Sequence, residues 1–148
     1  MSTLTLKLVT PERLVASMEA SAVTLPIADG DVTVLPEHTP YIGALKAGEV
    51  IVHLTDGREE SLAVSGGFVE FDSGMLSILA DTAERAEEID MERAEAARTL
   101  AETIQLRQES MSEEEYARVA AAIEKEMIRI KVVRKHHNRV GPNVITHE

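Results

Sequence analysis

The sequence of 148 residues contains no cysteine and no long apolar segment. Without thiols the chain forms no disulfide and no thiolate metal site, which is compatible with a reducing compartment. No apolar run approaches the roughly 20 residues that a helix needs to span a bilayer. The start, Met1 to Leu14, alternates polar and apolar residues and lacks the apolar core of a signal peptide. We therefore expect a soluble protein that does not insert into a membrane and stays in the compartment where it is made.

Basic charge is also scarce. The chain has 15 lysine and arginine residues against 26 acidic ones, a formal net charge of -11. A chain of this charge repels phosphate backbones and anionic lipid headgroups at long range, so we predict no nucleic-acid partner. The length allows a buried hydrophobic core and suits one domain, or one domain with a small appendage.

The first part of the chain alternates polar and apolar side chains, which is typical of strands with one face on a core. The clearest examples are Leu4 to Leu8, Val50 to Leu54 and Leu62 to Val64. Turn signals separate these runs at Thr10–Glu12, Ala28–Asp31, Pro36–Pro40, Lys46–Gly48, Asp56–Gly57, Gly66–Gly67 and Asp72–Gly74. Many short strands with frequent turns indicate an antiparallel sandwich or barrel.

Two of the glycine sites carry more specific predictions. Asp56 and Gly57 both tolerate positive φ and stand between two alternating runs, so they predict a tight hairpin. The pair Gly66–Gly67 indicates a bulge or a place where another backbone packs closely, in preference to a ligand contact.

The composition changes after Asp81. Glycine and proline are absent until Gly141, while alanine, glutamate and arginine become frequent, and these residues favour helices. A first helix is predicted to begin at Asp90, whose carboxylate can cap the free N–H groups of the first turn. Its predicted apolar stripe is Ala97, Leu100, Ala101 and Ile104.

A second helix is predicted to begin at Ser112, because Ser112 and Glu115 form an S-x-x-E capping box. Its predicted apolar side is Tyr116, Val119, Ala120, Ile123, Met127 and Ile130. Only Gln108 to Met111 separate the two helices, and so short a connection makes them antiparallel neighbours.

The predicted fold is therefore α+β. An N-terminal antiparallel β-sandwich occupies residues 1–86, an antiparallel two-helix hairpin residues 87–140, and a flexible tail residues 141–148. The helical stripes contain few large side chains, so most of their apolar surface is expected to join one helix to the other. Our hypothesis is that the hairpin is weakly docked on the sandwich and can move.

The second helix is predicted to end in a basic segment. Arg129, Lys131, Arg134, Lys135 and Arg139 lie in a stretch from Met127 to Arg139 that contains no acid. Complementation of the helix dipole explains such a distribution in part, because bases are stabilised near a helix C-terminus. The alternative interpretation is a basic end that meets an acidic partner surface.

No set of residues predicts an enzyme. Glu37–His38 lies on a loop between prolines and His53 on a nearby strand, positions where a general base can stand. No nucleophile, orienting third group or glycine-rich phosphate loop accompanies them, so we interpret His38 as a solvated side chain. His136, His137 and His147 lack the spacing of a closed metal site. We therefore predict no catalytic residues, no metal and no required cofactor.

Three segments together resemble a known family: GDVTVLPEHTP from Gly30, VSGGFVE from Val64 and LADTAERAEEID from Leu79. They are similar to the glycine-acid block ending in Pro-Gly-His-x-Pro, the Gly-Gly segment and the acid-x-Ala segment of the epsilon subunit of the proton-translocating ATP synthase. The likeness covers Leu4 to about Lys135. One departure is Glu37, where the family commonly has glycine.

The resemblance implies a non-catalytic rotor subunit of the central stalk that takes part in proton-driven ATP synthesis. The sandwich would bind the gamma subunit and rest on the membrane c-ring, with Asp31 and His38 facing the ring. The hairpin would permit turnover when folded, and would block ATP hydrolysis when extended along gamma into the alpha/beta catalytic head. The implied location is peripheral, at the cytoplasmic face of the bacterial inner membrane.

Some members of that family bind ATP through a motif of the form I/L-D-x-x-R-A, and Ile89 to Ala94 match it fully. The Arg93 guanidinium can pair with phosphate, and the free amides of a helix start add positive partial charge. The alternative is that Asp90 only caps the helix and Arg93 pairs with it at the surface. For the whole chain, the alternative to a stalk subunit is a free-standing β-sandwich ligand-binding protein or small enzyme.

Overall fold

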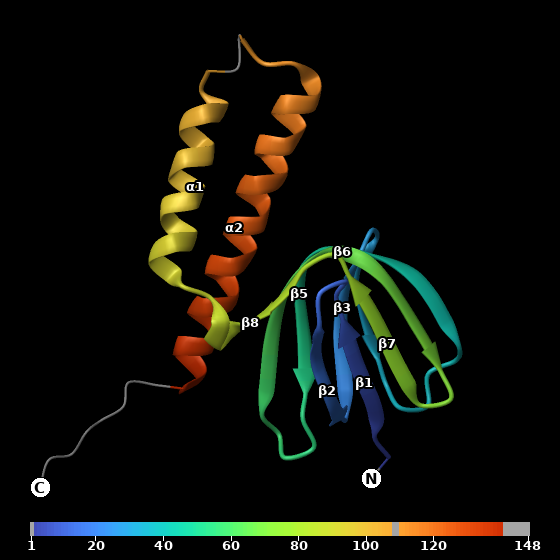
Figure 1. Ribbon diagram of the computed structural model, residues 1–148. Coiled ribbons are helices and arrows are strands. Elements are labelled where there is room, and N and C mark those ends of the chain that lie inside the picture. Colours follow the sequence, from blue (N-terminus) through green and yellow to red (C-terminus); the bar gives the residue numbers. More distant parts are fainter. Residues whose placement is uncertain (1, 108–109, 141–148) are drawn as a thin grey trace, which may run out of the picture. The chain divides into compact units, whose positions relative to one another are not determined.

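The computed structural model describes residues 2–107 and 110–140, and for residues 139–140 the backbone alone. The predicted tail over residues 141–148 lies outside this range. Figure 1 shows the elements, which are β1 (Leu4–Val9), β2 (Leu14–Ala20), β3 (Ala22–Ile27), β4 (Gly30–Val34), β5 (Tyr41–His53), β6 (Glu59–Asp72), β7 (Met75–Ala80), β8 (Ala83–Arg85), the 3-10 helix η1 (Ala86–Glu88), α1 (Met91–Gln105) and α2 (Glu113–Val140). The chain divides into two compact units, Met1–Glu88 and Ile89–Glu148.

The first unit is a β-sandwich made from one sheet that folds over itself. Its strand order is β2-β1-β7-β6-β5-β3-β4, with β8 paired to β6. Strand β7 pairs with the second half of β6 and β8 with the first half, so the two halves of this long strand belong to opposite layers. The predicted antiparallel sandwich is confirmed, with β1 and β7 as a parallel pair within it.

The glycine predictions had two outcomes. The hairpin at Asp56–Gly57 is confirmed, because Gly57 has a φ of 87° and joins β5 to β6. The turns predicted at Lys46–Gly48 and Gly66–Gly67 are wrong, because both segments lie inside the long strands β5 and β6. Glycine at these positions lets the strands bend from one layer to the other instead of ending them.

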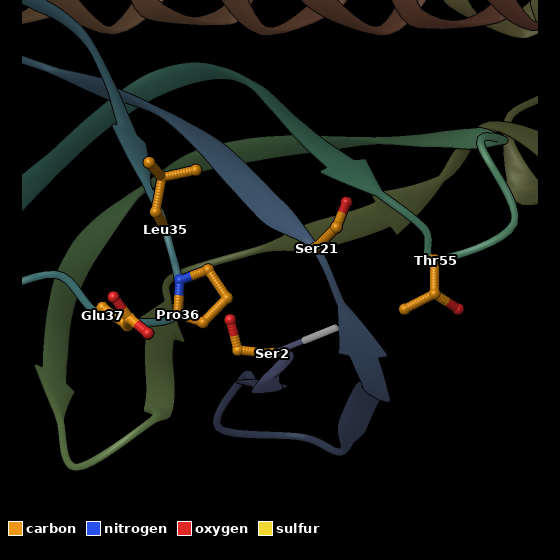
Figure 2. Close-up of a pocket in the computed structure, with 6 residues that line it drawn as sticks. All are labelled: Ser2, Ser21, Leu35, Pro36, Glu37 and Thr55. Carbon is orange, nitrogen blue, oxygen red and sulfur yellow. The ribbon is translucent and has the colours of Figure 1, made fainter.

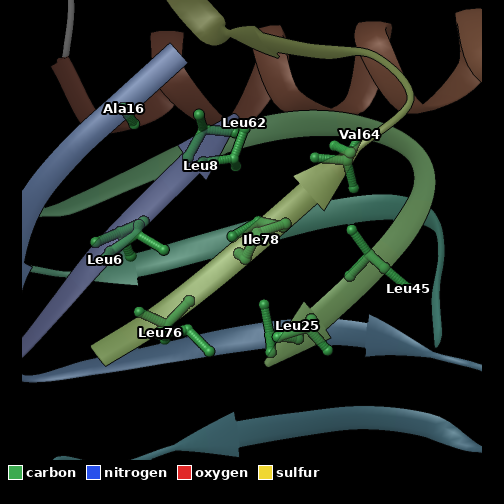
Figure 3. Close-up of a cluster of buried hydrophobic side chains, with 14 of the residues drawn as sticks. Leu6, Leu8, Ala16, Leu25, Leu45, Leu62, Val64, Leu76 and Ile78 are labelled. Carbon is green, nitrogen blue, oxygen red and sulfur yellow. The ribbon is translucent and has the colours of Figure 1, made fainter. Parts of the chain in front are cut away.

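The core lies between the two layers and follows the period-two pattern of the strands. The side chains of Leu6, Leu8, Leu25, Leu76 and Ile78 are all 0% exposed, and Figure 3 shows them within one cluster contributed by β1, β3 and β7. Each such burial contributes about 1.5–3 kcal/mol. Because Leu76 and Ile78 point inward, the alternate residues of β7 point outward, a choice that the sequence left open.

The second unit is the helix pair, and both predicted N-caps are confirmed. Asp90 Oδ1 accepts a hydrogen bond from the backbone N–H of Arg93 at 3.2 Å. Ser112 Oγ accepts from the N–H of Glu115 at 3.2 Å, and Glu115 Oε2 accepts from the N–H of Ser112 at 3.1 Å. These reciprocal bonds satisfy amides that have no partner inside the helix. Figure 1 shows α1 and α2 running antiparallel, side by side.

The predicted stripe of α1 is largely wrong. Leu100 is 64% and Ile104 38% exposed, whereas Ala94 and Ala101 are buried. Alanines allow two helix backbones to approach closely, so the helix turns its small residues inward and leaves its large ones outside. On α2, Ile130 is buried as predicted, but Met127 is 55% exposed. The hairpin therefore presents large apolar side chains to solvent.

Candidate functional site

Asp31 and His38, the residues predicted to face a ring, lie at opposite ends of β4. Asp31 is an exposed residue at the start of this strand, in register with Pro26 of β3. His38 lies in the loop that follows Val34. The three steps from Asp31 to Val34 already span about 10 Å of extended strand. Asp31 thus belongs to β4 and His38 to the turn after it, and among the residues that the structure describes no hydrogen bond or ion pair joins the two side chains.

The His38 ring is half-buried and packed, and is not the solvated side chain that we predicted. It stands edge-on to two aromatic rings, with centroid distances of 6.1 Å to Tyr41 and 6.0 Å to Phe71. Its Nδ1 lies 2.7 Å from the carbonyl oxygen of Thr39. A carbonyl only accepts hydrogen bonds, so Nδ1 donates here and Nε2 remains available for a partner.

His53 belongs to a polar network across the outer face of four strands. Its Nδ1 lies 3.1 Å from Glu59 Oε1, and its Nε2 lies 3.3 Å from Thr24 Oγ1. Thr24 Oγ1 is in turn 3.0 Å from Thr33 Oγ1. This network joins β6, β5, β3 and β4 by side-chain contacts and leaves that face polar.

A metal centre and a membrane span are both unsupported within the described residues. Over this part of the chain no group of three or more histidine, aspartate or glutamate side chains is placed to hold a metal ion. None of the helices that the structure describes combines the length and apolar character needed to cross a bilayer.

At the start of α1, Asp90 uses its carboxylate as a cap and Arg93 is exposed. The two residues are joined through the Arg93 backbone N–H. The capping interpretation of Asp90 is confirmed, and the Arg93 guanidinium lies at the surface of the first helical turn.

The predicted basic end divides into two parts. Arg129 Nη1 donates to Glu126 Oε2 at 2.8 Å, and both side chains are largely buried. Lys131, Arg134 and Lys135 share a groove on the hairpin, and the side chain of Arg139 lies outside the described residues. The groove is lined by Arg98, Met127, Ile130, Lys131, Arg134, Lys135 and Asn138. The groove therefore collects four cationic side chains from both helices, and we call it the basic groove.

Arg98 of the basic groove was missed by sequence reasoning because it lies on the other helix. The available signal was its spacing, four residues after Ala94 and three before Ala101, on the buried side of α1. Arg98 Nε is buried without a hydrogen bond and lies 3.6 Å from Glu102 Oε1. Arg134 Nη2 lies 3.8 Å from Glu95 Oε1. Four of the residues that line the groove are cationic and none is acidic, and guanidinium and ammonium groups can bind an anionic ligand.

A row of apolar side chains crosses the outward face of five neighbouring strands, and we call it the apolar row. Strand register places its members opposite one another in the order Ala44, Phe68, Leu79, Val9 and Leu14. Phe68 is 65%, Leu79 59% and Leu14 52% exposed. Exposed apolar patches are frequent at protein–protein contacts, so the apolar row is a candidate contact surface.

The last residue of the sandwich, Glu88, is hydrogen-bonded to Arg13 in the turn between β1 and β2. Arg13 donates from Nη1 to Glu88 Oε1 at 3.2 Å and from Nη2 to Oε2 at 2.8 Å. Glu88 Oε2 also accepts from the N–H of Arg85 at 3.2 Å. Hydrogen bonds from Arg13 hold the pKa of the Glu88 carboxyl below its usual range. The pair fixes the end of the first unit directly before the chain enters the second.

We expect Glu88→Gln to lower the thermal unfolding midpoint at pH 7, and the difference from wild type to shrink as the pH falls below about 4. A lowered native pKa stabilises the fold above the unfolded value of about 4.3 for glutamate, and this contribution is lost as pH falls through the native pKa. Thermal unfolding followed by circular dichroism across that range measures the difference. Glu87→Gln, which removes the neighbouring charge, is the control. A midpoint difference that stays the same as the pH falls would show that the ionised Glu88–Arg13 pair is not its source.

Comparison with known proteins identifies relatives over most of the chain. The family model for the beta-sandwich domain of the ATP synthase delta/epsilon chain matches residues 3–86. The ATP synthase epsilon chain of Moorella thermoacetica is 45% identical over 131 residues, which are 88% of this chain and 96% of the relative. That of Herpetosiphon aurantiacus is 41% identical over 134 residues, 90% of this chain and 96% of the relative.

Solved structures agree in fold. A chain in the mitochondrial ATP synthase of Euglena gracilis, solved as an OSCP/F1/c-ring assembly, matches with a TM-score of 0.75 and 23% identity, over 93% of this chain and 83% of its own. A chain in the central stalk/c-ring structure of Tetrahymena thermophila mitochondrial ATP synthase matches with a TM-score of 0.57 and 12% identity, over 87% and 95%. At these identities the likeness shows the fold alone.

Proposed function

This chain belongs to the ATP synthase epsilon-chain family, whose members are non-catalytic subunits of the central stalk, and we propose that it links the gamma subunit to the membrane c-ring and restrains ATP hydrolysis through its helical hairpin. The observation that carries the linkage is the apolar row. Rigid β-strands hold Phe68, Leu79 and Leu14 in fixed register, so the face is preformed. A preformed apolar face needs little ordering when a partner binds. We assign it to gamma.

We assign the ring contact to the β4 side of the sandwich. Strand β4 is the last in the sheet order, and Asp31 is exposed at its start. His38 follows its end, with Nε2 available to a partner because Nδ1 is engaged by Thr39. Because the two residues stand at opposite ends of the strand, contact through both requires β4 to lie along the ring surface. This orientation follows from the family resemblance and the strand geometry together.

The hairpin is the proposed regulatory element. Its exposed Leu100, Ile104 and Met127 can make apolar contacts with a partner. The positive charge of its basic groove can bind an acidic partner surface. A two-state element moves from 1:99 to 99:1 with about 5.5 kcal/mol of differential binding. Burial of a few such side chains against gamma or the alpha/beta head supplies free energy of this order. The extended hairpin would thereby block hydrolysis.

We propose ATP as a regulatory ligand of the folded hairpin. The basic groove supports this proposal, because it brings Arg98 of α1 together with Lys131 and Arg134 of α2. The exposed Arg93 is not among the residues that line the groove and is a further cation at the start of α1. Guanidinium groups bind phosphate through paired hydrogen bonds. No cofactor is required for the linking role. As part of this assembly, the protein would be peripheral at the cytoplasmic face of the bacterial inner membrane.

The test is ATP hydrolysis by the assembled enzyme with the full chain or with a chain that ends at Glu88. We expect truncation to raise the rate several-fold, because it removes Ile89–Glu148 and with them the inhibitory helices. With the full chain, inhibition should weaken at millimolar ATP, and Arg93→Ala with Arg98→Ala should remove this nucleotide dependence. Equal rates with full and truncated chains would refute the regulatory role and leave the linkage intact. A nucleotide response unchanged by the double substitution would refute the ATP site alone.

A further inference from the structure

A recess of about 430 Å³ lies at one end of the sandwich, lined by Ser2, Ser21, Leu35, Pro36, Glu37 and Thr55. These residues come from four separate segments: the chain start, the junction of β2 and β3, the loop after β4, and the turn after β5. Figure 2 shows Pro36 and Ser2 between Glu37 on one side and Thr55 on the other. The recess is open to solvent and belongs entirely to the first unit.

The polar groups of the recess can all accept hydrogen bonds, and the hydroxyls of Ser2 and Thr55 can also donate them. In the described part of the chain, no hydrogen bond or ion pair joins the Glu37 carboxylate to another residue, and the side chain is exposed. Ser21 Oγ donates its proton to the carbonyl of His53 at 3.0 Å, so only its lone pairs face the recess. Leu35, 55% exposed, and Pro36 supply an apolar wall beside these acceptors.

We propose that this recess receives one basic side chain of a partner protein, an arginine. An arginine has an apolar stem that can lie on Leu35 and Pro36, and five N–H donors that suit a carboxylate and hydroxyl oxygens on different sides. An anion would be repelled by Glu37, and an uncharged apolar ligand would strip water from that carboxylate without replacing it. The formal net charge of -11 steers cationic groups toward the protein.

The charge of the recess comes from Glu37. Glu37 is the residue at which the sequence departs from the glycine common in the family it resembles, and it supplies the only formal charge among the lining residues. The Glu37 backbone is part of the turn in which the N–H of His38 bonds the carbonyl of Leu35 at 3.0 Å. The added carboxylate is therefore held on an ordered turn at the edge of the recess.

The full-length, isotope-labelled protein titrated with N-acetylarginine amide, and followed by amide chemical shifts, tests the proposal. We expect saturable shifts at Ser2, Ser21 and Thr55. N-acetylcitrulline amide has nearly the same shape without the charge, and we expect it to bind at least about fivefold more weakly. Glu37→Gln should weaken arginine binding by a similar factor, and added salt should do so as well. Glu12→Gln, an exposed acid in the turn between β1 and β2, should leave binding unchanged.

Several outcomes would overturn the proposal. Equal binding of the citrulline and arginine amides would show that the recess selects shape and not charge. The proposal would also be wrong if the chemical-shift changes caused by the arginine amide persisted in Glu37→Gln, lay outside the recess or did not saturate. Tighter binding of N-acetyllysine amide would overturn the choice of arginine. Because the titration uses the isolated chain, its result is separate from whether the chain links gamma to the c-ring.

Discussion

Replacing Gly67 by alanine is expected to lower the free energy of unfolding by about 3 kcal/mol or more. Gly67 has a φ of 138°, a region that side-chain-bearing residues rarely adopt. A Cβ at this position would also overlap the carbonyl oxygen of Leu79 and lie 2.9 Å from the Cα of Ala80. Both atoms belong to backbone of the neighbouring β7, so relief requires strands to shift. Urea unfolding monitored by circular dichroism measures the loss.

Gly30→Ala is the matched control for this prediction. Gly30 has a similar φ of 127°, but an added Cβ there meets nothing within 4 Å. Its substitution should therefore cost only the backbone strain, about 1–2 kcal/mol. If the two variants were equally unstable, the backbone conformation alone would explain Gly67, and the close packing of β6 on β7 would contribute nothing.

The packing at Gly67 also positions the functional face. Gly67 pairs with Ala80 and the next residue, Phe68, pairs with Leu79, so the close approach of β6 and β7 sets two members of the apolar row side by side. The sequence prediction of a bulge or closely packed backbone at Gly66–Gly67 was right about the contact and wrong about a turn. A pair of glycines indicates unusual backbone geometry both in a turn and in a closely packed strand. Pairing with the neighbouring strand decides between these two.

Local signals were predictable from the sequence because their partners lie a few residues away. The caps at Asp90 and Ser112 bond amides three residues on, and the turn at Asp56–Gly57 depends on its own dihedral angles. The residues of β1 that point into the core, such as Leu6 and Leu8, could be predicted from the alternation of polar and apolar side chains alone. These signals sufficed for the sandwich, the hairpin and their order along the chain.

Features that depend on register between distant segments were not predictable in this way. The apolar row takes single residues from five strands, and no spacing along the chain brings Val9 next to Leu79. The predicted stripe of α1 was largely wrong because the helical spacing that selected it includes Leu100 and Ile104, which are exposed. Close helix packing selected Ala94 and Ala101 instead.

The candidate site residues also divide into those that the sequence predicted and those that required the tertiary structure. The sequence grouped the basic residues of α2 because the stretch from Met127 to Arg139 contains no acid; these residues are Arg129, Lys131, Arg134, Lys135 and Arg139. It could not separate Arg129, which is paired to Glu126, nor add Arg98 from the facing helix. Sequence proximity therefore predicted charge in a region, and the tertiary structure decided which charges act together.

Replacing Phe68 by glutamate is expected to weaken binding of the purified gamma subunit by about 30-fold to 1000-fold, or roughly 2–4 kcal/mol. Phe68 stands in the middle of the apolar row and is 65% exposed, so a charge there would be buried unpaired in the complex. Because the side chain contributes little to the core, the unfolding free energy should change by less than about 0.5 kcal/mol. Titration calorimetry with gamma measures the affinity.

Thr33→Glu is the control for this change, because it adds the same charge to the exposed outward face of β4 and to the polar network instead of the apolar row. It should leave gamma affinity within about twofold, since a charge outside an interface alters mainly the rate of encounter. If Phe68→Glu bound gamma with wild-type affinity, the apolar row would not be the contact surface for gamma. Equal loss in both variants would indicate a general effect of added negative charge. Only a loss confined to Phe68→Glu assigns this face to the stalk partner, and it would do so independently of the hairpin.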